Sequence, residues 1–439
     1  MYKVFFITFG CKVNQYETDS MRSEFVSQGF VETDSADDAD IIIINSCTVT
    51  GSGDSKSLYS VRKMRKIAPN AIIALTGCLP QAAPETAAKI PEADIVAGTK
   101  DRRKLPELVR SVIAERRHIV AIDQYGAHDE FELTRFEGAQ DKTRAFVKIQ
   151  DGCNQFCSYC IIPYARGRLR SKPIDALKDE VSRLAQSGRR EIVLVGINLA
   201  FYGVEFGLRL ADAVEVCCKT EGIERVRLGS LEPEILSDED LRRLAALPEL
   251  CPQFHLSLQS GSENTLKAMN RKYTAADYFT LTQKIRAAFP NASFTTDIMV
   301  GFPTETEEDF AESMRFAEKI GFAKIHVFQY SPRTGTPAAK MPQIAASVKA
   351  ERADRMKALA DRLHSARLQS LVGRTVAVLF ERENSTDFHR GYAPDYTLIK
   401  ISRKNPQKSL RNQIIRVIIE ENRSDYCFGR LESEAAQQE

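Results

Sequence analysis

The segment DGCNQFCSYCIIPYARG, residues 151–167, places three cysteines, Cys153, Cys157 and Cys160, within eight residues of one another. An aromatic residue, Tyr159, stands immediately before the last of them. The segment follows an apolar run, AFVKIQ at 145–150, which we expect to form a buried strand. The cysteines therefore lie just past the end of a strand, where open α/β folds bind their ligands.

Three clustered thiols point to soft-metal chemistry, because thiolates select zinc, copper(I) or iron–sulfur clusters. Structural zinc sites usually have four protein ligands. A [4Fe–4S] cluster held by three cysteines leaves one iron free to bind a small molecule. On the residues alone, this cluster is favoured over the two alternatives, a zinc site and a disulfide loop.

The segment opens a series of strand-like runs that alternate with helical ones. We predict strands at 145–150, 191–197, 225–230, 253–259, 293–300 and 324–330, and helices around 175–187, 208–220, 238–247, 274–288 and 306–320. Six such units predict a partial, open (β/α)6 barrel of the TIM type over residues 143–370, since a full barrel would need two more strands. A long charged helix at 345–370 ends this domain.

This loop and its context resemble the radical S-adenosylmethionine (SAM) superfamily, which carries a C-x3-C-x-aromatic-C loop after the first strand of a partial barrel. The resemblance implies that Cys153, Cys157 and Cys160 hold a [4Fe–4S] cluster and that Tyr159 contacts the adenine of SAM. It also implies that the reduced cluster cleaves SAM to methionine and a 5′-deoxyadenosyl radical. Polar or small residues after later strands are candidates for SAM binding, although they also suit helix capping: Gly196, Ser230, Glu232 and Asp297.

Residues 1–120 predict a different domain, a doubly wound parallel sheet, because continuous β-branched runs alternate with helices. Cys11, Cys47 and Cys78 each follow one of its strands. The carboxyl ends of parallel strands share one crevice, so three distant thiols can meet there. We expect a second [4Fe–4S] cluster with an open iron. The alternative of inert buried thiols suits the remaining cysteines better: Cys217, Cys218, Cys251 and Cys427.

Two further regions complete the chain. Residues 121–142 lose the periodicity and are predicted to be a linker. Short β runs at 371–432 predict a small β-barrel, and 433–439 a disordered tail. Tyr392 and Tyr396, with Arg403, Lys404, Lys408 and Arg411, give this barrel the aromatic and basic character of an RNA-binding surface.

The whole arrangement resembles the methylthiotransferase family, with a C-terminal TRAM-like barrel. Phrases that carry the resemblance include IQDGCNQFCSYCIIPYARGRLRS, LSLQSGSENTLKAMNRKYT and TDIMVGFPTETEEDF. Members attach a methylthio group to C2 of a modified adenosine in tRNA or to an aspartate of a ribosomal protein. The resemblance implies that the second cluster delivers sulfur, and that tRNA, an electron donor and a sulfur source are partners.

The phrase FGCKVNQYETDSM at 9–21 is closest to the branch that acts on N6-threonylcarbamoyladenosine beside the anticodon. The isopentenyl-adenosine branch has a GCQMN-like phrase there, and the ribosomal-protein branch a GCPKN-like one, so Lys12-Val13 separates them. Arg166, Arg168 and Arg170 follow the cluster loop and are predicted to bind substrate phosphates or a carboxylate. His255 and His326 lie in strand patterns, where we expect ordinary packing.

The composition of the chain limits the classes of function that are possible. The net charge is only +2, so any RNA contact must come from local basic patches. No apolar run approaches the ~20 residues of a membrane span, and the N-terminus has no signal-peptide pattern. Ten cysteines without such a signal favour metal chemistry in a reducing cytoplasm. An iron–sulfur RNA-binding sensor is an alternative of another class, but it would not need the SAM-binding phrases.

Overall fold

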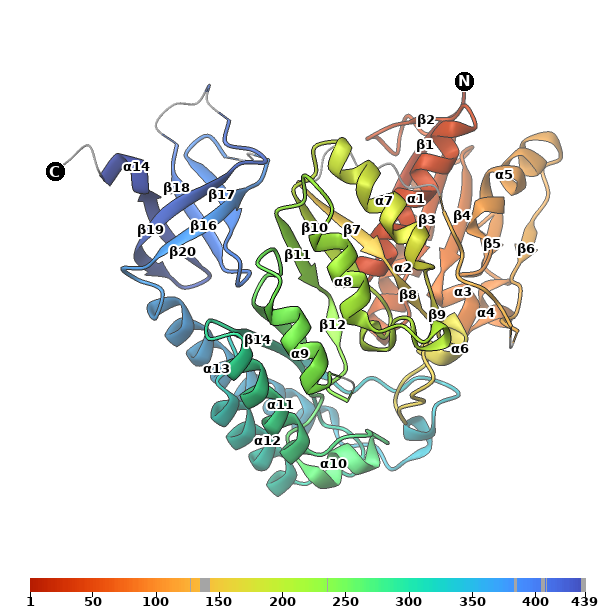
Figure 1. Cartoon of the computed structure of the whole chain (residues 1–439). Coiled ribbons are helices and arrows are strands. Elements are labelled where there is room, and N and C mark those ends of the chain that lie inside the picture. Colours follow the sequence, from red (N-terminus) through yellow and green to blue (C-terminus); the bar gives the residue numbers. More distant parts are fainter. Residues whose placement is uncertain are drawn as a thin grey trace.

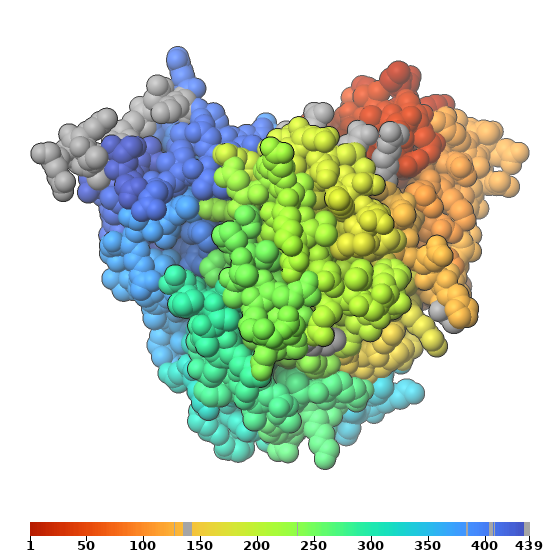
Figure 2. Space-filling model, viewed as in Figure 1, coloured from red at the N-terminus to blue at the C-terminus, as the bar shows by residue number. Residues whose placement is uncertain are grey.

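The computed structural model describes residues 1–126, 128–134, 143–234, 236–382, 385–403, 407 and 409–435. Three domains follow one another along the chain, and the central one lies between the other two (Figure 1). The space-filling view shows the central domain covering most of this face, between the C-terminal barrel on the left and the N-terminal domain on the right (Figure 2). Among the described residues, no helix combines the length and apolar character needed to cross a bilayer.

The N-terminal domain is built on a six-stranded parallel sheet, which confirms the predicted doubly wound fold. Its strands are β1 (Lys3–Thr8), β2 (Val31–Glu32), β3 (Ile41–Ser46), β4 (Ile72–Gly77), β5 (Ile95–Ala97) and β6 (Ile119–Ala121), in the order β2-β1-β3-β4-β5-β6. The isoleucines of β3 are fully buried, because helices cover both faces of the sheet. The strand order reverses between β1 and β3, which creates a ligand-binding crevice at their carboxyl ends.

Helices on the two faces have separate apolar cores. One face carries α1 (Lys12–Ser27) and α5 (Leu105–Ala114), and the other carries α2 (Gly51–Ile67) and the short α4 (Pro84–Ala87). The short α3 (Cys78–Ala82) follows β4 directly. The sequence ETDSMRSEFVSQGF predicts a helix at 17–30, and α1 begins five residues before it. Strand β6 overlaps the start of the predicted linker.

The central domain contains the six predicted β/α units, all with parallel strands. Its strands are β7 (Arg144–Lys148), β10 (Glu191–Val195), β11 (Arg225–Leu228) with β12 (Ser230–Leu231), β13 (Gln253–Leu256), β14 (Ser293–Val300) and β15 (Lys324–Gln329). Gly229 separates β11 from β12 and donates its amide to Leu194 at 2.8 Å. The short strands β8 (Gln150–Asp151) and β9 (Arg170–Ser171) pair beside the cysteine loop.

The helices of this domain are α6 (Ile162–Arg166), α7 (Ile174–Gln186), α8 (Leu210–Cys218), α9 (Asp238–Ala245), α10 (Glu263–Ala268), α11 (Ala275–Ala288), α12 (Glu307–Ile320) and α13 (Ala346–Gln369). Ser237, Thr274 and Thr306 cap α9, α11 and α12 through capping boxes, which explains why these helices start where they do. Short 3-10 turns lie at Arg102–Lys104, Leu199–Phe201, Val204–Phe206 and Pro337–Lys340.

The C-terminal domain is a closed five-stranded barrel, β16-β17-β18-β20-β19, as expected for a TRAM-like domain. Its strands are β16 (Thr375–Phe380), β17 (Phe388–Tyr392), β18 (Leu398–Ser402), β19 (Ile414–Arg423) and β20 (Tyr426–Leu431). A short helix, α14 (Glu432–Ala435), occupies part of the predicted tail. Lys404 and Lys408, predicted to contact RNA, lie outside the described residues.

Candidate functional site

Hydrogen bonds and a glycine fix the conformation of the three-cysteine loop of the central domain. Ser158 anchors it by donating its amide to Met269 O (3.0 Å) and its hydroxyl to Ala268 O (2.8 Å). Gly152 has φ +71°, and a Cβ there would lie 1.9 Å from Arg168 O. Only glycine fits this position, where the strand turns into the loop.

Donors surround the thiols of this loop. Cys153 Sγ accepts from Gln155 N (3.5 Å) and Asn198 Nδ2 (3.6 Å), and Cys157 Sγ accepts from Arg271 Nη1 (3.3 Å). Burial raises the pKa of Cys160 to about 12, so its free thiol stays protonated, whereas a coordinated thiol loses its proton. N–H groups directed at the sulfurs are typical of protein sites that hold iron–sulfur clusters. The donor set therefore fits a cluster with three thiolate ligands.

The loops that carry Cys11, Cys47 and Cys78 converge at the switch point of the N-terminal sheet. A Cβ added to Gly10 would lie 2.8 Å from Cys47 Cβ and 3.0 Å from its Sγ, so the Cys11 loop packs directly on Cys47. Burial raises the pKa of Cys78 to about 11, and the neighbouring thiols of Cys47 and Cys11 add to this rise. The structure thus places the loops that carry these three cysteines at one edge of the sheet, although they are far apart in the sequence.

Arg166 joins these two sets of cysteines. Its side chain is fully buried, and it donates to Glu17 Oε1 (2.7 Å) and Asn14 Oδ1 (2.7 Å) on α1. The Asn14 amide in turn donates to Phe9 O (2.8 Å) and Ser46 O (2.9 Å), which lie next to the Cys11 and Cys47 loops. The segment after the first cysteine loop is therefore linked by hydrogen bonds to the N-terminal thiol loops.

A buried ionic network extends from this link. Glu17 also lies 2.8 Å from Lys148 Nζ and 3.1 Å from Arg102 Nη2. Although burial opposes ionisation, Arg102, Arg166 and Lys148 lower the pKa of Glu17 to about 2. The network holds the N-terminal domain against the first strand of the central barrel.

The three arginines predicted to bind substrate differ in their exposure. Arg170 is 7% exposed, and it donates to Arg166 O (3.0 Å) and Arg168 O (2.8 Å). Its guanidinium also lies 4.5 Å from the centre of the Tyr125 ring. Arg166 and Arg170 are thus occupied by interactions within the protein, and only Arg168 presents its side chain to solvent.

A cavity of about 850 Å³ lies inside the central barrel and is lined by all three domains. The N-terminal domain contributes Cys11 and Lys12, and the C-terminal barrel contributes Tyr392 and Tyr396. Of the four SAM-binding candidates that follow later strands, three also line it: Gly196, Ser230 and Asp297. Because Cys11 and these barrel residues face one volume, a reaction in the cavity can involve both domains.

The fourth residue, Glu232, forms an ion pair with Arg271. Burial raises the pKa of Glu232, and the adjacent guanidinium opposes this rise. Since Arg271 also donates to Cys157 Sγ, it connects Glu232 to the cysteine loop. The sequence did not reveal this role, although Arg271 stands in a phrase that carried the family resemblance.

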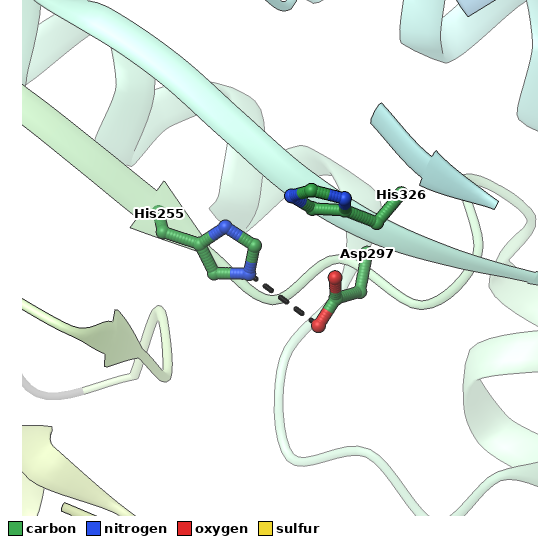
Figure 3. A group of neighbouring side chains, drawn as sticks. All are labelled: His255, Asp297 and His326. Atoms are coloured by element: carbon green, nitrogen blue, oxygen red, sulfur yellow. Dashed lines mark ion pairs between the residues drawn. The ribbon is translucent and has the colours of Figure 1, made fainter. Parts of the chain in front are cut away.

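His255, Asp297 and His326 form a cluster on the cavity wall (Figure 3). His255 Nε2 lies 3.4 Å from Asp297 Oδ2, and His255 Nδ1 lies 3.0 Å from Thr295 Oγ1. Asp297 lies within β14, three residues before its end, and is paired in register with His326. The expectation of ordinary packing was wrong for both histidines, and the two-residue period of the adjacent strands could have revealed their shared face.

Cations gather where the C-terminal barrel meets this cavity. Arg144 donates to the Tyr396 hydroxyl (2.6 Å), and the Arg227 guanidinium lies 4.5 Å from the centre of the Tyr396 ring. Lys12 Nζ lies 5.4 Å from the same ring centre. Burial, together with Arg144 and Arg227, lowers the pKa of Lys12 to about 8. Tyr392 and Tyr396 therefore face this domain junction.

Comparisons with known proteins agree with this architecture. The radical SAM superfamily profile matches residues 147–317, and that of the uncharacterized protein family UPF0004 matches residues 3–98. The radical SAM methyltransferase TsrM from Kitasatospora setae shares the fold, with a TM-score of 0.59 over 77% of each chain and 13% identity.

Curated relatives match over most of the chain. The threonylcarbamoyladenosine tRNA methylthiotransferase MtaB of Bacillus subtilis is 39% identical over 366 residues, covering 83% of this chain and 81% of the relative. The protein of that name from Thermotoga maritima is 38% identical, covering 85% of each. The tRNA-2-methylthio-N(6)-dimethylallyladenosine synthase of Pelotomaculum thermopropionicum is 38% identical, covering 87% of each. With this coverage and identity, the chain belongs to the radical SAM tRNA methylthiotransferase family, whose members are enzymes.

Proposed function

We propose that this enzyme methylthiolates C2 of N6-threonylcarbamoyladenosine beside the anticodon of tRNA. The relatives of that name from Bacillus subtilis and Thermotoga maritima support this substrate. Lys12 and Val13, the pair that separates the branches of the family in sequence, line the barrel cavity. A tRNA substrate implies action in the cytoplasm, with an external electron donor and sulfur source.

In this proposal, Cys153, Cys157 and Cys160 hold one [4Fe–4S] cluster. When bound with SAM, this group supplies a radical that can act on an unreactive bond such as the C2–H of adenine. Arg271 and Asn198 donate hydrogen bonds to the thiolates and hold them in place. Tyr159 packs against Met269 and Phe302, among other apolar residues, which fixes its ring for contact with adenine.

The side chains that bind the rest of SAM are proposed from their positions. Gly196, Ser230 and Asp297 line the cavity, and Glu232 is held by Arg271 beside the cysteine loop. A Cβ on Gly196 would lie 3.0 Å from the Gln150 side chain, so close packing also favours glycine at this position. Ser230 is exposed, and Asp297 lines the cavity with one carboxylate oxygen 3.4 Å from His255 Nε2.

The second cluster is assigned to Cys11, Cys47 and Cys78, and when bound it supplies the sulfur. Arg166 places a buried positive charge near these thiols, and this charge counters the rise in the pKa of Cys78. That charge suits thiolates that carry a metal cluster. The observation that carries the proposal is that Cys11 lines the same cavity as three of the proposed SAM-binding residues, Gly196, Ser230 and Asp297.

The surface beside the first cysteine loop has side chains that suit contact with RNA. Phe156 and Tyr164 are 49% and 51% exposed, with ring centres 5.9 Å apart, and Arg168 lies close by in sequence. Exposed aromatic rings stack on unpaired bases, and arginine binds phosphates. We assign this surface and the C-terminal barrel to tRNA binding.

Iron and sulfide analysis of anaerobically prepared protein tests the cluster assignment. We expect about eight irons per chain, falling to about four when Cys11, Cys47 and Cys78 are replaced by alanine. Cys217→Ala is the matched control, because Cys217 is fully buried in α8, and iron should not change. Eight irons in the triple variant would refute the assignment.

The substrate is tested with tRNA that carries or lacks the threonylcarbamoyl group. Efficient methylthiolation of the tRNA that lacks it would refute this substrate. The Pelotomaculum thermopropionicum relative makes N6-dimethylallyladenosine the second candidate. Activity on dimethylallyl-modified tRNA, with none on the threonylcarbamoyl form, would establish that candidate instead.

A further inference from the structure

Lys12 occupies an unusual place for a lysine. It is the first residue of α1, directly after Cys11, and its partly buried side chain lines the cavity inside the barrel. Tyr396 from the C-terminal barrel lies 5.4 Å from its ammonium. The lysine is therefore held at the point where all three domains meet.

Among the described residues, no carboxylate forms an ion pair with the Lys12 ammonium, and Glu191 acts on it only at longer range. The nearest cations are already paired, because Arg227 lies 2.7 Å from Glu191 and Arg144 lies 2.7 Å from Glu381. These carboxylates are thereby occupied. A partly buried cation without a counter-ion is costly, so the site favours an anion supplied by a ligand.

His326 lines the same cavity as Lys12 and stands on β15. Burial lowers the pKa of its imidazole, which is therefore neutral near pH 7. Asp297 and His255 face it from β14 and β13, and Lys324 lies on its own strand. Its imidazole can donate a hydrogen bond to an acceptor in the cavity while Asp297 engages His255.

We propose that Lys12 and His326 form a subsite for the carboxylate of the substrate's threonylcarbamoyl group. This inference rests on the proposed function and explains how the cavity could select that substrate. A dimethylallyl group has no charge and would leave the Lys12 ammonium unpaired. An unpaired buried charge penalises the wrong ligand, which is an effective source of specificity.

A second carboxylate is available in the same enzyme, that of SAM itself. The substrate is favoured because Lys12 adjoins Cys11, in the N-terminal domain, whereas the SAM loop lies in the central domain. The experiment therefore includes SAM as a separate arm. A loss of SAM affinity in the variant, with RNA discrimination retained, would assign Lys12 to SAM and overturn the proposal.

The test measures binding to the cluster-loaded enzyme. Two anticodon stem-loop RNAs are compared, one with the threonylcarbamoyl carboxylate and one with the uncharged carboxamide in its place. For the wild type we expect the carboxylate RNA to bind about 10–100-fold more tightly, as for a charge-assisted hydrogen bond. Equal affinities would overturn the proposal without any variant.

Variants then locate the interaction. Lys12→Gln should lose most of the discrimination, Lys12→Arg should retain it, and His326→Gln should reduce it. Lys63→Gln removes a surface charge from α2 and serves as the control, with discrimination unchanged. Because Lys12 adjoins Cys11, iron and sulfide content is measured for every variant, and only preparations with equal content are compared. Full discrimination in Lys12→Gln would overturn the proposal.

Failure of this inference differs from failure of the proposed function. If the wild type methylthiolates threonylcarbamoyl tRNA but does not distinguish the two RNAs in binding, the subsite is wrong and the function stands. If it acts only on dimethylallyl tRNA, the proposed substrate is wrong, and the carboxylate subsite falls with it.

Discussion

Arg166, Arg168 and Arg170 show how far neighbouring residues of one type can differ. All three belong to a single basic phrase, and the sequence offers no means of separating them. In the structure, Arg166 is turned toward α1 and pairs with Glu17, while Arg168 is turned outward. The buried guanidinium needs a carboxylate and an amide that lie about 150 residues earlier, and such partners become visible only in the folded chain.

Arg271 provides a prediction at the same scale. It donates a charged N–H to Cys157 Sγ at 3.3 Å, and a nearby positive charge stabilises the reduced, more negative state of a cluster. Arg271→Gln should therefore lower the reduction potential of the proposed radical SAM cluster. A redox titration followed by electron paramagnetic resonance measures the shift.

The neighbouring Lys272→Gln is the matched control for this experiment, because Lys272 is exposed and donates to Asn270. It removes the same charge without touching a thiol. Equal potentials in Arg271→Gln and Lys272→Gln would contradict the role assigned to Arg271.

At the scale of elements, the strands were predicted well and α1 was not. Fully buried β-branched runs such as IIII at 41–44 have few alternatives to a central parallel strand. Helix α1 begins before its predicted start at Glu17 because the segment GCKVN at 10–14 has the composition of a loop, and its first turns carry two polar residues, Asn14 and Glu17. Both are almost completely buried, since this face of the helix packs on the central domain. A polar face that forms a domain junction has the same sequence pattern as a solvated one.

Glu17 gives that junction a defined pH dependence. Its pKa is about 2 in the folded protein, against 4.5 for an unperturbed glutamate, because Arg102, Arg166 and Lys148 surround it. Since the folded value is the lower one, the ionised carboxylate stabilises the fold above about pH 4.5. This stabilisation is lost as the pH falls through the folded value. Asp151, whose pKa Lys148 and Arg166 also lower, adds in the same direction.

We predict that Glu17→Gln lowers the free energy of unfolding by about 3–5 kcal/mol at neutral pH. The difference from the wild type should shrink as the pH is lowered from about 4.5 toward 2. Urea unfolding of the cluster-free protein, followed by circular dichroism, measures both effects. A difference that stays constant over this pH range would show that the charge of Glu17 does not cause the loss.

At the scale of the whole molecule, the order of the three domains could be predicted, but their shared cavity could not. Each cysteine position followed from the end of a strand, which is a local property. The cavity wall combines Cys11, His326 and Tyr396, which are separated by hundreds of residues and belong to different domains. The tyrosines of the C-terminal barrel were predicted to stack on RNA, and instead lie against arginines of the central domain. The hydrophobic periodicity of each domain's own sequence cannot predict how the domains pack against one another.

The docking of the C-terminal barrel can be tested through Tyr396. Removing the whole barrel would expose Arg227, whose guanidinium donates to Ala393 O (2.7 Å) and Pro394 O (2.6 Å), so a single substitution is the cleaner probe. Tyr396→Ala removes the ring that lies against Arg144 and Arg227, and we expect the barrel to dock about 3–5 kcal/mol less tightly. Tyr396→Phe keeps the ring and loses only the hydroxyl bonded to Arg144, so its effect should be about 1 kcal/mol.

Limited proteolysis between α13 and β16 measures how tightly the barrel docks. The cleavage rate should increase in the order wild type, Tyr396→Phe, Tyr396→Ala. The affinity for tRNA should fall in the same order, while SAM cleavage persists. Equal proteolysis rates in all three proteins would mean that other contacts, such as those of Arg225 with Tyr392 O and Ala377 O, hold the barrel in place.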